Sequence, residues 1–233
     1  MIKKQSLSIL LALSFTTQVV YAADLTGEGE LGFTSTSGNT DSETLNAKIG
    51  LGKEHGNWKH SAKLELLQSS DRGVESANSA VFTEKSEYRF AEKTFVFGRI
   101  RHEEDEFSGF DHQSLISFGV GHVFFANGHN FEASAGVGYK QLEDDLGAES
   151  EETVFDGELK YLYKISETST FNQNVFVEGG ETNTYTKSET FLKLVVVGNL
   201  GAKFGYEVKH NSDVPLGTDK TDTVTTVTLV YSF

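Results

Sequence analysis

The sequence predicts an all-β protein, a transmembrane antiparallel up-and-down β-barrel of about twelve strands with both termini in the periplasm. Three observations predict it: an export signal at the N-terminus, short segments that alternate apolar and polar residues, and a last alternating segment that ends on Phe233. Barrel strands present every second residue to lipid and the others to the lumen. A two-residue period is therefore the membrane-spanning signal to look for.

The first residues have the pattern of a cleavable secretory signal. Lys3 and Lys4 supply positive charge, residues 7–20 are mainly apolar, and Ala22 offers a small side chain for cleavage. The apolar stretch is too short and too often interrupted by polar residues to cross a bilayer as a helix. We therefore expect a signal peptide over residues 1–22 and one outer-membrane barrel domain over residues 23–233, located in the outer membrane of a Gram-negative bacterium.

Composition narrows the function. The chain has 34 acidic and 20 basic residues and a net charge of −14, which argues against nucleic acid as a partner because phosphate binding needs concentrated positive charge. It has no cysteine, so an exported domain would take its rigidity from a closed, hydrogen-bonded sheet instead of from disulfides. No later segment holds the roughly 18 consecutive apolar residues of a membrane helix.

The C-terminal segment alternates most clearly. One face carries Thr223, Thr225, Val227, Leu229, Tyr231 and Phe233, and it becomes more aromatic toward the chain end, where a barrel strand meets the membrane interface. Comparable alternation occurs over residues 44–53, 131–141, 152–165 and 202–209. Residues 95–103 and 190–197 alternate less cleanly, which leaves ten or fourteen strands open.

Alternation alone does not separate a membrane barrel from a soluble one, because the two differ only in which face points inward. Aromatic residues at strand ends, such as Phe131 and Tyr163, and charges of both signs on the opposite faces favour the membrane barrel. Connections also alternate in length. Short turns are expected around residues 54–57, 90–94, 126–129, 166–169 and 198–199, and mostly longer polar loops around residues 37–41, 68–79, 104–111, 143–151, 179–187 and 211–220.

Two stretches resemble a known family. Residues 34–41, Thr-Ser-Thr-Ser-Gly-Asn-Thr-Asp, resemble the N-terminal signature of the YdiY-like domain family of unknown function, named as salt-induced outer-membrane proteins. Residues 209–215, 220–223 and 229–233 are similar to the closing hairpin of that family. The resemblance implies an outer-membrane barrel linked to salt or osmotic stress, and no catalytic or ligand residues. Leu229, Tyr231 and Phe233 also resemble the C-terminal signal that the barrel-assembly machinery recognises.

Charged residues on the non-apolar faces are the candidate lumen-lining set. These are Lys48, Lys63, Glu65, Glu87, Arg89, Arg99, Arg101, Glu132, Lys140, Glu158, Lys160, Lys193, Glu207 and Lys209. In an open pore such groups select solutes by charge, whereas in a closed barrel they pair across strands and plug it. A barrel of about twelve strands has an intermediate lumen. The sequence leaves both states open.

The leading hypothesis is a non-enzymatic, porin-like barrel that acts as a narrow charge-lined channel or an envelope component, without cofactor. Its expected partners are outer-membrane lipids, the barrel-assembly machinery, and divalent cations at acidic loops. A phospholipase-like hydrolase is the alternative, with Asp111, His112 and Ser114 supplying residue types for nucleophilic catalysis. A cation-binding or adhesion surface on the acidic run at residues 101–106 is a third, because carboxylates bind calcium and magnesium.

Overall fold

The structure is a computed structural model, and it describes residues 25–36, 42–108, 110–126, 128–144, 147–214 and 218–233. The predicted signal peptide and most of the N-terminal family signature lie outside these residues. The strands are β1 (Leu25–Thr36), β2 (Ser42–His55), β3 (Trp58–Asp71), β4 (Val74–Arg89), β5 (Thr94–Asp105), β6 (His112–Ala126), β7 (His129–Glu143), β8 (Glu149–Lys164), β9 (Ser169–Gly179), β10 (Thr184–Val197), β11 (Leu200–Asn211) and β12 (Thr221–Ser232).

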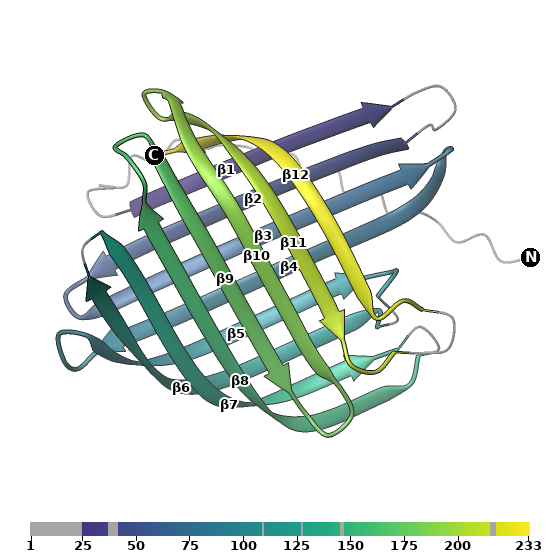
Figure 1. Cartoon of the computed structure of the whole chain (residues 1–233). Helices are drawn as coiled ribbons and strands as arrows, with labels where there is room; N and C mark the ends of the chain where they lie inside the picture. Colours follow the sequence, from purple (N-terminus) through teal and green to yellow (C-terminus); the bar gives the residue numbers. More distant parts are fainter. Residues whose placement is uncertain (1–24, 37–41, 109, 127, 145–146, 215–217) are drawn as a thin grey trace, which may run out of the picture.

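Each strand pairs antiparallel with its neighbours in the sequence, and β1 pairs with β12 to close the barrel (Figure 1). At the joint, Gly27 N donates to Phe233 O at 2.7 Å and Phe233 N donates to Gly27 O at 2.9 Å. The predicted up-and-down barrel and its number of strands are thereby confirmed. Among the described residues there is no helix long and apolar enough to cross a bilayer.

The β1–β12 joint is much shorter than the others. Its register runs only from Glu28 opposite Ser232 to Leu31 opposite Leu229, whereas β1 and β2 are in register over the whole length of β1. Beyond Leu31 the described parts of β1 and β12 are not paired with each other, and the two strands diverge there (Figure 1). We call this joint the seam.

The two ends of the barrel differ in their connections. We call the end where β1 begins and β12 ends the terminal end, and the opposite one the loop end. Gly56, Gly128 and Gly198 occupy turns at the terminal end with φ of 57°, 84° and 54°, a region that glycine enters without a steric penalty. These turns fall where short connections were predicted.

Two predicted longer loops are wrong. Only residues 180–183 connect β9 to β10, where a loop over residues 179–187 was predicted. Residues 68–79 form no long loop, because β3 continues to Asp71 and β4 starts at Val74. Arg72 and Gly73 make the connection with φ of 51° and 74°. Two consecutive positive φ values match the twist of paired strands, so a tight hairpin turn replaces the loop.

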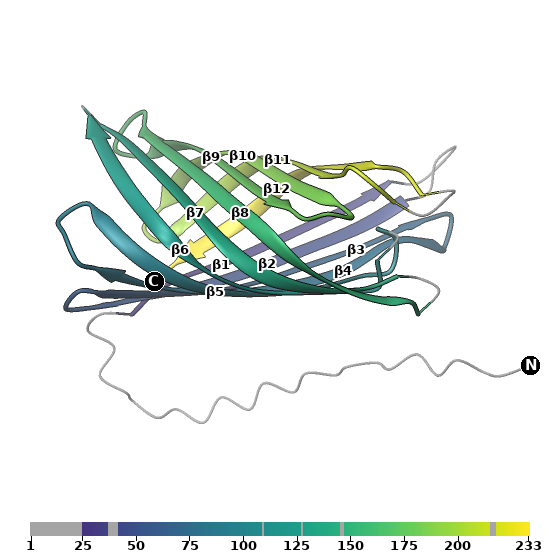
Figure 2. The ribbon, with the colours of Figure 1, turned by 90° about the horizontal axis from the view of Figure 1, so that it is seen from below.

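The two faces of the wall are inverted relative to a soluble protein. Apolar side chains cover the outside, where Phe155, Phe33 and Phe118 are 73%, 65% and 63% exposed. Charged side chains such as Glu178 and Lys140 are buried inside. Figure 2 shows β1 to β5 as a nearly flat wall with β8 to β12 arched over it. Ion pairs of Lys48 with Glu189 and Glu207 join the two walls across the interior.

Candidate functional site

The inner face of the barrel is the candidate site, and its charges are paired. The structure places each of the candidate lumen-lining residues in at least one ion pair: Lys48, Lys63, Glu65, Glu87, Arg89, Arg99, Arg101, Glu132, Lys140, Glu158, Lys160, Lys193, Glu207 and Lys209. Several pairs join strands that are not neighbours, so they cross the interior.

The first cluster joins β2 and β3 to β10 and β11. Lys48 Nζ lies 2.9 Å from Glu65 on the adjacent strand, 2.8 Å from Glu189 and 3.3 Å from Glu207 on the facing wall. Lys187 of β10 also forms an ion pair across the interior, with its Nζ 3.1 Å from a carboxylate oxygen of Glu65. One buried ammonium thus bridges three carboxylates, which ties the two walls together.

This cluster also brings three carboxylates close enough to suggest a cation site. Oxygen atoms of Glu65, Glu189 and Glu207 lie within 4.8 Å of one another. Lys48 and Lys187 stand among them and supply positive charge and hydrogen bonds. Ammonium groups already neutralise these carboxylates, so the cluster needs no metal ion.

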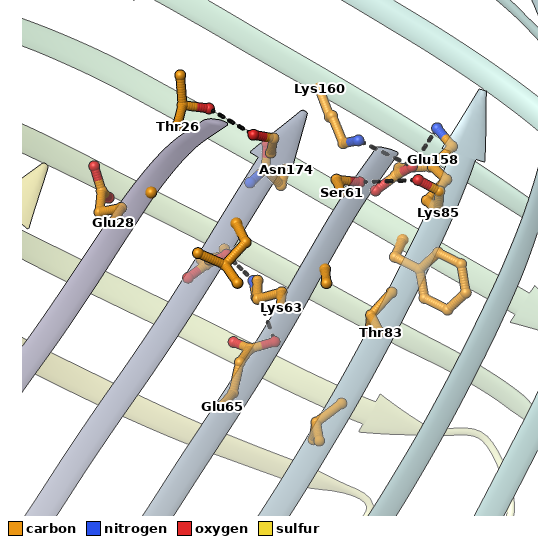
Figure 3. Close-up of a pocket in the computed structure, with 18 of the residues that line it drawn as sticks. Thr26, Glu28, Ser61, Lys63, Glu65, Thr83, Lys85, Glu158, Lys160 and Asn174 are labelled. Carbon is orange, nitrogen blue, oxygen red and sulfur yellow. Dashed lines mark hydrogen bonds and ion pairs between the residues drawn. The ribbon is translucent and has the colours of Figure 1, made fainter. Parts of the chain in front are cut away.

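The second cluster joins β4 and β5 to β7 and β8, and Figure 3 shows part of it. Lys85 Nζ lies 3.1 Å from Glu158 and 3.4 Å from Glu132. Arg99 contacts Glu158 at 2.6 Å and Asp156 at 2.5 Å through its two terminal nitrogens. The guanidinium therefore forks between two carboxylates, an arrangement that its planar donors favour.

The third cluster closes the loop end. Lys209 of β11 lies 2.8 Å from Glu103 and 3.2 Å from Asp105, both of β5, and Arg101 also pairs with Glu103. In the closed strand order β5 and β11 are six strands apart in either direction. Opposite walls therefore touch at this level, and we call the contacts of Lys209 with Glu103 and Asp105 the β5–β11 clasp.

Aromatic rings fill the space next to the clasp. The guanidinium of Arg99 lies over the rings of Phe97 and Phe176, with its Cζ 5.1 and 4.8 Å from their centroids. The guanidinium of Arg101 lies over the rings of Phe176 and Tyr185, with its Cζ 5.9 and 4.6 Å from their centroids. Guanidinium groups over ring faces gain cation–π attraction. Arg99, Arg101 and Phe176 also form part of the wall of the large cavity described next.

The terminal-end half is hollow. A cavity of about 760 Å³ extends from Phe233 and from Asn199 in the β10–β11 turn to Glu65, Arg101 and Lys187. We call it the vestibule; Figure 3 shows Lys63, Lys85 and Lys160 among its lining residues. A separate void lined by Lys48 and Lys209 measures only about 30 Å³, close to the volume of a single water molecule. The interior is thus wide at one end and filled at the other.

Several interior charges were not in the candidate lumen-lining set. They are Glu28, Glu30, Lys85, Glu103, Asp105, Asp156, Glu178, Lys187, Glu189 and Lys203. The two-residue alternation could have identified them. A loop was predicted to start at residue 104, but β5 continues to Asp105. It sends Arg101, Glu103 and Asp105 inward and His102 and Glu104 outward.

The residues of the hydrolase hypothesis lie outside the barrel wall. His112 and Ser114 share the outer face of β6, and Asp111 precedes the strand. Ser114 Oγ is 2.8 Å from Nδ1 of His102. Both edges of β6 pair here with β5 and β7, so the nearby N–H groups serve the sheet and not an oxyanion hole. The pair does not form a nucleophilic site of recognisable geometry.

A closed antiparallel barrel with apolar residues outside and paired charges inside is the fold of outer-membrane barrels. The structure is similar to an outer-membrane channel of Pseudomonas putida F1, the COG4313 channel, with a TM-score of 0.56 and 9% identity over 90% of this chain and 95% of that one. It is also similar to the NanC porin, with a TM-score of 0.52 and 12% identity over 89% and 97% of the two chains. The translocator domain of the autotransporter NalP from Neisseria meningitidis has a TM-score of 0.50 and 11% identity over 90% and 87%.

At these identities the likenesses show the fold alone. No curated protein matches the chain in sequence. The profile of a family described as protein of unknown function, DUF481, matches residues 29–233. The chain therefore belongs to the DUF481 family, which is the YdiY-like family, and the family membership predicted from residues 34–41 and the closing hairpin is confirmed.

Proposed function

We propose that the protein is a non-enzymatic outer-membrane barrel of a Gram-negative bacterium, and that it acts as a narrow, charge-lined channel closed at rest by the β5–β11 clasp. One observation carries the proposal: the vestibule of about 760 Å³ ends at the crossing pair of Lys187 with Glu65 and at Arg101, and the clasp lies beyond Arg101, which pairs with Glu103. The apolar outer face and the outer-membrane barrel fold support the location in the membrane.

The geometry limits what passes. The vestibule carries charges of both signs, so it admits small hydrated ions of either sign with little selection. Beyond it the void of about 30 Å³ has room for a single water. Transport through the loop end therefore requires Lys209 to separate from Glu103 and Asp105.

The orientation in the membrane belongs to the same proposal. The terminal end, with its tight turns, would face the periplasm, and the loop end would face the cell exterior, as in barrels with short periplasmic turns. Leu229, Tyr231 and Phe233 lie on the outer face at the terminal end and are 62%, 54% and 57% exposed. They would serve as the assembly signal and as lipid contacts at once.

Planar bilayer recording tests the channel. The variant Lys209→Met with Asp105→Asn opens the clasp and leaves the Arg101–Glu103 pair intact, so no charge is left alone in the interior. We expect a small conductance for the wild type and a several-fold larger one for the variant. Lys53→Met, an exposed lysine on the outer face at the terminal end, is the control and should keep the wild-type conductance.

If neither wild type nor variant conducts, the channel is refuted and the barrel is a plugged envelope component, which the many cross-barrel pairs also favour. The link to salt stress that the family resemblance implies would act in the vestibule and not at the buried clasp. Salt weakens solvated ion pairs, such as those of Lys63 and Lys160 in the vestibule, more than buried ones. Conductance that rises faster with salt than bulk conductivity would support this role, and strict proportionality would oppose it.

A further inference from the structure

The outer face at the loop end holds a cluster of metal-ligating side chains that the channel does not use. His102 and Glu104 are alternate residues of β5, and His112 is the first residue of β6. Glu104 lies directly opposite His112 in the register, and His102 lies opposite Ser114. Since alternate residues of a strand share a face, the four side chains form one patch outside the wall.

The distances within this patch suit a transition metal. One ligand atom from each of His102, Glu104 and His112 lies within 4.8 Å of the others. His102 Nε2 is 3.5 Å from Glu104 Oε1, near the separation of about 3.4 Å that two ligands have in a tetrahedral zinc site with bonds of roughly 2.0–2.1 Å. The His112 ring lies nearly parallel to the His102 ring, with centroids 6.2 Å apart.

Ser114 holds His102 in the tautomer that can bind a metal ion through Nε2. Its Oγ is 2.8 Å from His102 Nδ1, so the hydroxyl accepts a hydrogen bond from Nδ1–H when Nε2 carries the lone pair. Nε2 is the nitrogen that faces Glu104. Histidines that bind metals commonly donate their other ring N–H to an outer partner, which fixes the tautomer and the ring orientation.

We propose that His102, Glu104 and His112 form a zinc site at the outer rim of the loop end, with the fourth coordination position open to water or to an external ligand. Two imidazole nitrogens select zinc over calcium or magnesium, which prefer oxygen ligands. The His102 and Glu104 side chains are 44% and 58% exposed, so a metal ion reaches them from solvent.

The chain contains a matched control. His210 of β11 also lies on the outer face near the loop end, and its Nδ1 is 2.8 Å from the hydroxyl of Thr221 on β12. Among the described residues no carboxylate or second histidine joins it in a ligand cluster. His210 therefore reproduces the cross-strand histidine–hydroxyl pair without the rest of the site.

Calorimetric titration of the full chain in detergent, produced without a histidine tag, tests the site with Zn²⁺ as the probe. We expect one Zn²⁺ per chain, at least tenfold weaker binding in His102→Ala, His112→Ala and Glu104→Gln, and unchanged binding in His210→Ala. Ser114→Ala should weaken binding roughly 10- to 100-fold as the loss of an outer partner. Ca²⁺ in excess should not compete.

Co²⁺ in place of Zn²⁺ gives an independent readout, because its visible absorption reports four-coordinate nitrogen and oxygen ligands. Migration of unheated samples on gels shows that each variant keeps the folded barrel. The site is refuted if Zn²⁺ does not saturate, if His102→Ala and His112→Ala bind as the wild type does, or if His210→Ala weakens binding equally. The last result would indicate nonspecific binding to surface histidines.

Discussion

The pair between Lys140 of β7 and Glu178 of β9 is the most deeply buried one, and its removal should be costly. Lys140 Nζ lies 2.5 Å from Glu178 Oε1, and the two side chains are 1% and 0% exposed. Lys140→Met leaves the carboxylate without its partner, which costs about 3–5 kcal/mol at buried sites. The unfolding constant should then rise roughly 150- to 5000-fold, at about 1.4 kcal/mol per factor of ten.

Guanidinium unfolding of the barrel in lipid vesicles, followed by fluorescence of Trp58, measures this effect. With a slope of about 4 kcal/mol per molar, the midpoint should fall by about 1 M. Lys160→Met is the control, because that lysine pairs with Glu158 at 3.3 Å but is 37% exposed; solvated pairs contribute about 1 kcal/mol or less.

The double variant Lys140→Met with Glu178→Leu removes both charges and keeps the volume, so its stability should return close to that of the wild type. The reasoning is refuted if Lys140→Met lowers the midpoint no more than Lys160→Met does. It is also refuted if the double variant is as unstable as the single one, because the cost would then come from packing and not from the orphaned charge.

Two further predictions concern packing and assembly. Gly121→Ala should destabilise the barrel by about 1–3 kcal/mol, because the new Cβ would lie 2.2 Å from Cζ of Phe95. Gly29→Ala, whose Cβ would meet nothing within 4 Å, should be near neutral in the same unfolding measurement. Equal unfolding midpoints for the two variants would contradict this prediction. Phe233→Ser should lower the fraction of chain that reaches the membrane as a folded barrel, measured on unheated gels, more than Phe155→Ser does on the outer face. Equal yields would show that Phe233 contributes lipid contact alone.

The sequence predicts a strand well where the two faces of that strand differ in chemistry. The segments in β5 and β10 alternate less cleanly because their two faces are more alike. In β12 the last outward residues are Val227, Leu229, Tyr231 and Phe233, and Thr226, Thr228 and Ser232 alternate with them, so the alternation is plain toward the chain end. In β5 the inner face carries Phe95 and Phe97, both buried, so aromatic residues occupy the polar side of the pattern. In β10 the inward Phe191 likewise places an aromatic residue on the polar side of the alternating pattern. Its ring centroid lies 3.9 Å from the ammonium of Lys203.

The cross-barrel contacts were beyond the reach of the sequence. Alternation assigns Lys209 and Glu207 to the inner face, but it does not say which opposite strand they meet. That depends on the closure of the barrel and on the stagger of its strands, which place β11 against β5 at one level and against β2 at another. The wide and filled halves of the interior follow from these contacts, so the sequence left an open and a plugged barrel equally possible.

The seam makes the circumference of the barrel mechanically uneven. Four residue pairs, from Glu28 to Leu31, and the two hydrogen bonds between Gly27 and Phe233 join β1 to β12. Separating these strands therefore breaks fewer hydrogen bonds than separating any other neighbours. Local opening occurs where the fewest contacts are lost, so amide protons at the seam should exchange first. The unpaired edges beyond Leu31 are also able to accept a strand from another chain. The last step of closing the ring during assembly, and the first step of unfolding, are therefore expected at the same place.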